Sequence, residues 1–170
     1  LLLGTAKGIY KRTMKGVWER LKLIPIPERV NEILVISEYQ GYASTKKGLY
    51  LFDLETGQSK LVFTRSNNLE KDCLSAAIGE GGFIAIGSRS GLFIRQNLDG
   101  EFIKYGSPFD NSEIVSVSNN NGAVYAATAN KVYKTFDRGI TWEEILNIYS
   151  SGEIFHEEVA ENGNPEDLNK

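Results

Sequence analysis

A short segment recurs four times along the chain at nearly constant spacing, and this repeat constrains the fold more than any other feature. Each copy runs from a strand end of small residues through a short polar turn into an aliphatic–aromatic pair. The copies occupy residues 3–10, 43–50, 86–93 and 126–133. Their anchors, Gly8, Gly48, Gly91 and Lys131, lie 40, 43 and 40 positions apart. Because one such unit cannot bury its apolar face alone, we expect the units to stack on one another.

Four short strands can be placed in a complete unit. The innermost strands are expected at 33–36, 74–78 and 114–117, where apolar and β-branched residues suit burial on both faces. A tight turn follows each of them, at Gln40-Gly41, Gly81-Gly82 and Asn121-Gly122. The second strands are expected at 42–44, 83–86 and 124–127, the third at 9–11, 49–52, 92–95 and 132–134, and the fourth at 18–23, 60–63, 101–105 and 142–146.

This pattern predicts an all-β fold, a β-propeller of four recognisable four-stranded antiparallel blades. The blades form either a complete small ring or part of a larger propeller. Residues 1–149 make up the blades, at about 1–32, 33–73, 74–113 and 114–149, and the first unit begins at its second strand. The tail, 150–170, either supplies the missing innermost strand and closes the ring, or forms a short helix followed by a frayed end.

The turn between the third and fourth strands of the last unit is the most distinctive local motif. It reads Thr-Phe-Asp-Arg-Gly-Ile-Thr-Trp over residues 135–142. Asp137 can accept hydrogen bonds from backbone N–H groups across the turn, and Gly139 suits a positive φ. Trp142 supplies a large ring that needs a core to bury it. The sequence therefore predicts a hairpin turn that is anchored to the body of the last blade.

The motif resembles the Asp-box of sialidase-like and sortilin-like propellers, Ser/Thr-x-Asp-x-Gly-x-Thr-Trp, with matches at Thr135, Asp137, Gly139, Thr141 and Trp142. Residues 86–92 are similar to the repeats of sensor propellers, and photosystem assembly-factor propellers are also similar. The resemblance implies that the box lies on the outer rim with a structural role. Because such proteins usually have about six to eight blades, it also implies a small closed ring, a fragment, or a homodimer in which two chains complete one propeller ring.

Nothing in the sequence assembles catalytic chemistry, so we expect a protein that is not an enzyme. Glycosidases use paired carboxylates, but no acid/base pair is set here by spacing, and the arginines occupy no repeated position. His156 is the only histidine and Cys73 the only cysteine, which leaves no cluster of transition-metal ligands. Cys73 is expected to be a small core residue. We predict no catalytic residue, no metal site and no cofactor.

Net charge and hydropathy restrict the kinds of partner that the chain is expected to bind. The formal charge of −3 gives no reason to expect nucleic acid. No apolar run approaches the roughly 18 residues of a membrane span. A protein, or an anionic or glycan ligand, is the expected partner. The family resemblance implies an extracytoplasmic location, periplasmic or secreted.

Charge is also sorted along the repeat. The turns between second and third strands carry cations in every unit and no acid: Lys7, Lys46, Lys47, Arg89 and Lys131. In a propeller these turns share one face, so they predict a positive ring that attracts an anionic partner. The alternative is that they are ordinary solvated turns, because the loops between blades bring acids such as Asp72 and Glu113 to the same face.

The favoured function is a non-catalytic binding propeller, a protein–protein interaction or ligand-sensing module. Two alternatives remain open at this point. One is a fragment of a sialidase-like, glycan-acting hydrolase whose catalytic residues lie elsewhere. The other is a structural assembly factor.

Overall fold

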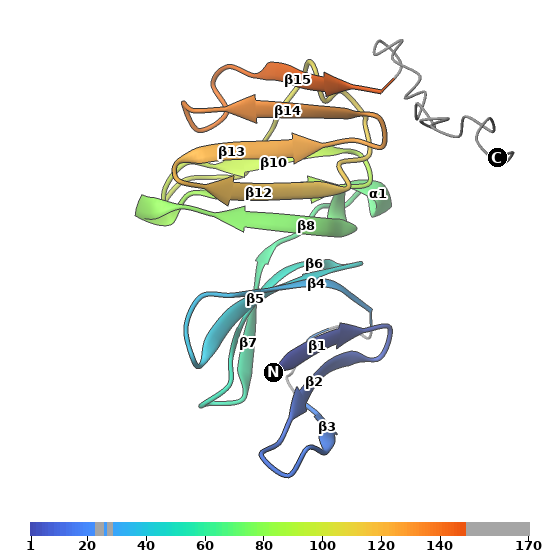
Figure 1. Cartoon of the computed structure of the whole chain (residues 1–170), viewed down its shortest axis with the longest axis vertical. Coiled ribbons are helices and arrows are strands. Elements are labelled where there is room, and N and C mark those ends of the chain that lie inside the picture. Colours follow the sequence, from blue (N-terminus) through green and yellow to red (C-terminus); the bar gives the residue numbers. More distant parts are fainter. Residues whose placement is uncertain (23–25, 27–28, 149–170) are drawn as a thin grey trace, which may run out of the picture.

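The computed structural model describes residues 1–22, 26 and 29–148. These residues form four separate antiparallel sheets, which follow one another along the chain and are stacked in an arc (Figure 1). Three sheets have four strands, and the first has three. The predicted all-β propeller architecture is confirmed, because each sheet runs outward in chain order through consecutive hairpins.

The first two sheets contain seven strands. The first sheet consists of β1 (Leu2–Thr5), β2 (Gly8–Arg12) and β3 (Trp18–Arg20). The second consists of β4 (Val30–Val35), β5 (Gln40–Thr45), β6 (Gly48–Asp53) and β7 (Gln58–Phe63). As the sequence predicts, the first sheet lacks an innermost strand among the described residues, so β1 is its inner edge. The closing strand or helix expected in the tail lies outside the described residues.

The third and fourth sheets follow a single turn of helix, α1 (Asn68–Lys71). The third sheet consists of β8 (Cys73–Ile78), β9 (Ile84–Ser88), β10 (Gly91–Arg95) and β11 (Ile103–Lys104), with the short 3-10 helix η1 (Glu80–Gly82) between β8 and β9. The fourth consists of β12 (Ser116–Asn120), β13 (Ala123–Ala127), β14 (Lys131–Thr135) and β15 (Glu143–Asn147).

Several expected elements are shifted in the structure, among them the innermost strand of the second sheet, which begins at Val30 instead of residue 33. Gln40 and Gly41 belong to β5 rather than to the preceding turn, which instead spans residues 36–39 and in which Ser37 Oγ accepts from the Gln40 N–H at 3.1 Å. The innermost strand of the fourth sheet starts at Ser116 instead of residue 114, because the Ile114 side chain is fully buried in the core and its N–H donates to Ser88 of the third sheet. The turns at 81–82 and 121–122 lie where the sequence predicts them.

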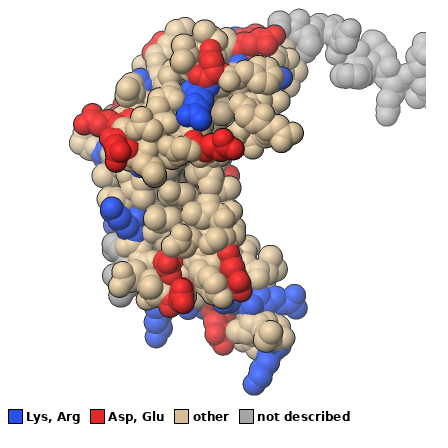
Figure 2. Space-filling view, turned by 90° about the vertical axis from the view of Figure 1, so that its left-hand side faces the viewer, with Lys and Arg blue, Asp and Glu red and all other residues tan. Residues whose placement is uncertain are grey.

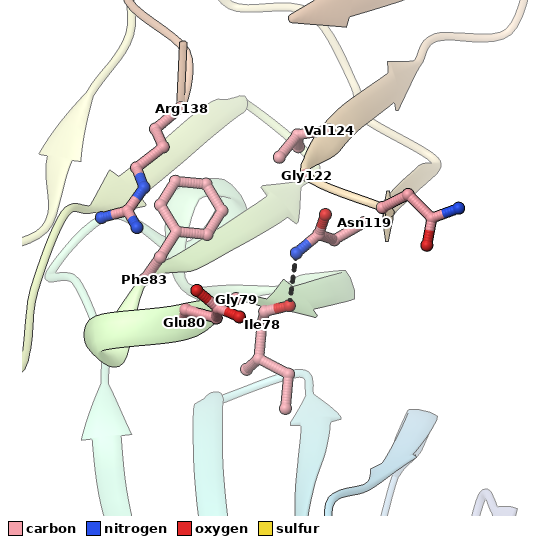
Figure 3. Close-up of a pocket in the computed structure, with 9 residues that line it drawn as sticks. Ile78, Gly79, Glu80, Phe83, Asn119, Gly122, Val124 and Arg138 are labelled. Carbon is pink, nitrogen blue, oxygen red and sulfur yellow. Dashed lines mark hydrogen bonds between the residues drawn. The ribbon is translucent and has the colours of Figure 1, made fainter. Parts of the chain in front are cut away.

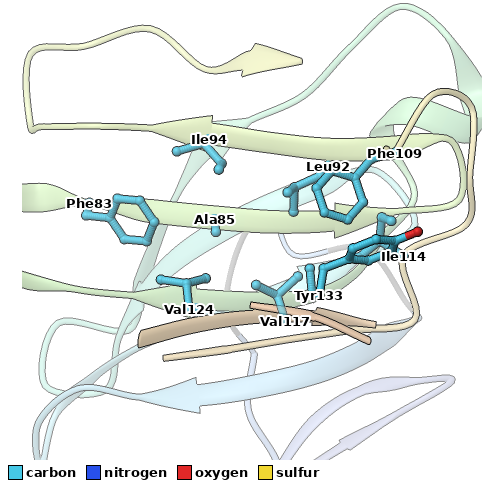
Figure 4. Close-up of a cluster of buried hydrophobic side chains, with 11 residues drawn as sticks. Phe83, Ala85, Leu92, Ile94, Phe109, Ile114, Val117, Val124 and Tyr133 are labelled. Atoms are coloured by element: carbon cyan, nitrogen blue, oxygen red, sulfur yellow. The ribbon is translucent and has the colours of Figure 1, made fainter. Parts of the chain in front are cut away.

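The core consists of three apolar layers between consecutive sheets. The layer between the third and fourth sheets is the largest, with Phe83, Ile94, Phe109 and Val124 among its members (Figure 4). Burying a side chain of this size contributes roughly 1.5–3 kcal/mol. Cys73 belongs to the middle layer and is fully buried, as expected for a small core residue. The apolar layers therefore hold the sheets in their order around the arc.

Polar side chains near the inner edge also connect consecutive sheets. Ser75 of β8 donates from Oγ to Glu32 Oε1 of β4 at 2.9 Å, and Ala76 N–H donates to Glu32 Oε2 at 2.7 Å. Ser75 Oγ also accepts from the N–H of Val117 in β12 at 3.1 Å. Three inner strands are thus linked through one hydroxyl and one carboxylate.

The arc does not close within the described residues. Figure 2 shows a molecule that is concave on one side, with the first sheet at one end and the fourth at the other. The architecture is that of part of a propeller, with a sheet face open at each end.

Candidate functional site

Most of the hydrogen bonds that hold the Thr135–Trp142 turn involve the side chains of Thr135 and Asp137. Thr135 Oγ1 donates to Asp137 Oδ1 at 2.6 Å and accepts from the Gly139 N–H at 3.0 Å. Asp137 also accepts from the Thr141 N–H at 2.9 Å and from Thr141 Oγ1 at 2.6 Å. Hydrogen bonds from Thr135 and Thr141 stabilise the charged carboxylate and hold the pKa of Asp137 well below its usual range. The carboxylate oxygens of Asp137 therefore accept hydrogen bonds from within the turn and hold its conformation.

Gly139 and Trp142 connect the same turn to the core. Gly139 has a φ of 91°, and a Cβ there would lie 2.5 Å from Ile94 Cδ1 of the third sheet. Trp142 Nε1 donates to Gly139 O at 3.1 Å, and its ring packs edge-on against Phe109 with centroids 4.9 Å apart. The turn therefore lies close against the neighbouring sheet, and its geometry fixes the position of Arg138.

A repeated hydrogen bond shapes the turns that carry the predicted cations. A Ser or Thr at the end of each second strand donates to a carbonyl three residues later, at 2.7–3.4 Å, and accepts a backbone N–H from within the turn. The four residues are Thr5, Thr45, Ser88 and Thr128. The sequence analysis did not predict this hydrogen bond. The small polar residue at the end of each second strand is the feature that could have predicted it.

The structure separates the five predicted cations into two groups. Lys7, Lys46 and Lys47 are exposed in the first two sheets. Arg89 instead lies between Asp72 and Glu113, with Nε 2.8 Å from Asp72 Oδ2 and Nη1 3.2 Å from Glu113 Oε1.

Lys131 is also paired, with Nζ 2.7 Å from Glu144 Oε2. These acids raise the pKa values of Arg89 and Lys131, chiefly through the hydrogen bonds that Asp72 accepts from Arg89 and Glu144 accepts from Lys131. A positive ring of equal strength around this face is therefore not formed, because acids offset the charge at the third and fourth sheets. Binding by the three exposed lysines remains a prediction.

The opposite face contains a pocket of about 700 Å³ between the third and fourth sheets. Three turns line it: residues 79–80 with Phe83 from the third sheet, residues 119–122 from the fourth, and Arg138 from the Asp137 turn. Figure 3 shows Arg138 extending from the fourth sheet toward Phe83 and Glu80, while Asn119 donates to Ile78 O at 2.8 Å. The two sheets therefore form a polar rim above a floor that includes the buried ring of Phe83.

The charged groups of this pocket are available for a partner. Within the described ranges, the Arg138 guanidinium and the Glu80 carboxylate have no hydrogen-bond or ion-pair partner. The backbone of Arg138 is nevertheless fixed, because its carbonyl accepts from Gln96 Nε2 at 3.0 Å. Arg138 and Asn121 also have positive φ values of 59° and 51°. A non-glycine residue held in this region costs free energy, and such residues concentrate at functional sites.

Sequence reasoning did not single out this pocket as a site. In the sequence, Arg138 stands out only as one residue of the 135–142 turn. The separation of two consecutive sheets is what turns three loops into a cavity. In the part of the chain that the structure describes, no group of three or more His, Cys, Asp or Glu side chains could hold a metal ion. No described helix is long and apolar enough to cross a membrane.

Neither a protein-family model nor the sequence of a curated protein matches the chain. Solved structures do resemble it. The extracellular domain of the hybrid two-component system BT4673 from B. thetaiotaomicron superposes with a TM-score of 0.67 at 15% identity, over 85% of this chain and 20% of that one. PorZ, a surface component of the type-IX secretion system of Porphyromonas gingivalis, gives a TM-score of 0.62 at 14% identity, over 86% and 20%.

YCF48 bound to D1 peptide is a third similar structure, with a TM-score of 0.51 at 13% identity, over 68% of this chain and 38% of that one. The chain therefore spans about a fifth of the first two proteins and less than half of the third. At these identities the similarity shows the fold alone. The chain is similar to part of several propeller-containing proteins.

Proposed function

We propose that the protein is a non-catalytic binding module whose recognition site is the pocket between the third and fourth sheets. The observation that carries this proposal is the Arg138 guanidinium, which is held at a fixed loop position but has no partner among the described residues. A guanidinium binds a carboxylate through two parallel hydrogen bonds, which makes it selective as well as strong. The class of ligand that fits is one that carries a carboxylate.

A segment of a partner protein is the favoured ligand. Glu80 on the same rim suits an amine or a backbone N–H of the segment, and the exposed Asn121 can accept and donate hydrogen bonds. The similar structure of YCF48 holds a peptide, which supports a peptide partner for this chain. The similar domains of BT4673 and PorZ are extracellular or at the surface, and they support an extracytoplasmic location.

A peptide-display library that includes acidic sequences tests the proposal. Peptides selected on the intact protein are measured by calorimetry against the wild type, Arg138→Ala, and a Lys46→Ala/Lys47→Ala control that alters the opposite face. We expect Arg138→Ala to weaken binding about tenfold or more, and the lysine variant to bind like the wild type. Failure to select any peptide, or affinity that is indifferent to Arg138, contradicts the proposal.

Two further measurements separate the alternatives. Turnover of aryl glycosides that is abolished by a single carboxylate substitution would identify a glycan-acting hydrolase instead. Affinity for an acidic oligosaccharide, lost in Arg138→Ala, would keep the site but replace the peptide by a glycan.

A further inference from the structure

The first sheet has one covered side and one open side. Leu2, Ile9 and Leu21 point toward the second sheet and join its apolar layer. Leu3, Tyr10 and Trp18 alternate with them and point the other way. We call the side that carries these three residues the leading face. Leu3 is 49% exposed and Trp18 41%, and with Tyr10 they line a shallow, mainly apolar pocket of about 340 Å³.

The repeat shows what the leading face lacks. Tyr10 stands two positions after its anchor, Gly8, as Tyr50, Phe93 and Tyr133 stand after theirs. Those three side chains are only 5%, 1% and 5% exposed. Phe93 and Tyr133 are buried in layers shared with the preceding sheet. The leading face is therefore a sheet-to-sheet interface without its preceding sheet.

The fourth sheet shows the complementary situation. Val132 stands one position after its anchor, where the earlier units have Ile9, Leu49 and Leu92. Those three residues are buried against the sheet that follows them, whereas Val132 is only half-buried. Its cross-strand partner, Leu146, is 48% exposed. We call the side that carries Val132 and Leu146 the trailing face.

Charge indicates which surface meets the leading face. Residues 1–22 contain six basic residues and one acidic residue, a charge of +5. Residues 114–148, which include the strands of the fourth sheet, contain three basic and three acidic residues and carry no net charge. Figure 2 shows Lys and Arg gathered at the lower end of the molecule, where Figure 1 places the first sheet. Two leading faces would therefore repel each other, whereas the fourth sheet of a second copy presents no net charge that would repel a leading face.

We propose that the leading face of one chain packs on the trailing face of a second copy of the same chain. This contact continues the sheet-to-sheet interface that occurs three times within each chain. Two copies arranged head to tail would make the contact twice and close a ring of eight sheets, since each chain contributes four. Closure covers both open faces, which as free apolar surfaces would promote indiscriminate association.

Molar mass in solution tests the proposal directly. Light scattering of the full chain is expected to give twice the 18.9 kDa of one chain. Leu3→Lys on the leading face and Leu146→Lys on the trailing face should each raise the dissociation constant about 100-fold, because a charged ammonium is buried at the contact. Leu69→Lys in α1 is the matched control, since Leu69 is exposed and on neither face.

Mixing the two variants distinguishes a head-to-tail contact from any symmetric one. Each variant keeps the face that the other has lost, so an equimolar mixture should regain a dimer through one native contact. Circular dichroism checks that both variants fold. The proposal is overturned if the wild type remains monomeric at high concentration, if Leu3→Lys dimerises like the wild type, or if the mixture stays monomeric. The contact does not involve Arg138, so these outcomes leave the proposed peptide site untouched.

Discussion

Glu32 and Ser75 stand on the innermost strands of neighbouring sheets, and a 2.9 Å hydrogen bond joins them near the inner edge of the arc. Burial is the main influence on Glu32 and raises the pKa of its carboxyl group, while hydrogen bonds from Ala76, Ser75 and Ser44 oppose the rise. The carboxylate is thus retained in a site that disfavours its charge because it satisfies two donors of the next sheet.

The Glu32 carboxyl should give stability a component that falls as pH rises. Its folded pKa lies above the unfolded value of about 4.3, so the folded state binds more protons over that interval and the free energy of unfolding decreases with pH. Glu32→Gln keeps the shape of the side chain and removes the titration. Urea unfolding between pH 4 and 8 should show a decrease over this interval in the wild type that is absent from the variant. Parallel curves for the two proteins would contradict the assignment.

The Asp137 carboxylate should make the protein less stable as the pH falls into the acid range, the opposite of the effect of Glu32. The folded pKa of Asp137 is lowered, so its stabilising contribution is present above the unfolded value of about 3.9 and is lost as pH falls below it. Asp137→Asn should therefore flatten the acid limb of a plot of melting temperature against pH. Asp99→Asn is the control, because the Asp99 carboxylate accepts no hydrogen bond from the residues that the structure describes. An unchanged acid limb in Asp137→Asn would count against the role assigned to this turn.

Gly139 should tolerate substitution much less well than a glycine of similar conformation. Gly139 and Gly122 have φ values of 91° and 82°, and any L residue costs about 1–2 kcal/mol in this region. At Gly139 a Cβ would also overlap Ile94 Cδ1, which is confined in the core, whereas nothing lies within 4 Å at Gly122. We expect Gly139→Ala to lose about 1–3 kcal/mol more than Gly122→Ala, measured by chemical unfolding. Equal losses of stability in the two variants would mean that the third sheet shifts to make room for the added Cβ, and would contradict the prediction.

The Thr45 hydroxyl should contribute more to the free energy of unfolding than the hydroxyl of its counterpart, Thr128. Thr45 Oγ1 is fully buried, donates to Gly48 O at 2.7 Å and accepts the Lys47 N–H at 3.1 Å. Thr45→Val keeps the shape and removes both of these hydrogen bonds from a buried site, a cost of about 1–3 kcal/mol. At the half-buried Thr128, where the corresponding donor–acceptor distance is 3.4 Å, water can replace the hydroxyl and the loss should be smaller. Unfolding of both variants in urea compares the two losses.

The sequence by itself determined the blades, because what defines them is local. Each sheet is a series of hairpins between consecutive strands, so the anchors Gly8, Gly48 and Gly91 and the turns at 81–82 and 121–122 are enough to locate most strands. The sequence also predicted the hairpin turn at Thr135–Trp142, because the hydrogen bonds among its five motif residues span at most four positions.

Only the tertiary structure decided how the blades meet and which charges remain available. The sequence placed Arg89 in the positive ring and put acids on the same face. Asp72 lies next to Arg89 across the β8–β9 pair, 17 positions away, whereas only the packing of the fourth sheet beside the third brings Glu113, 24 positions away, to the same guanidinium. Arg138, which the sequence showed only as a turn residue, instead lies at a pocket formed with loops of another sheet. The contact of Arg89 with Glu113 and the pocket at Arg138 both depend on the angle and spacing between consecutive sheets. Those are set by the apolar layers as a whole, and no short stretch of sequence specifies them.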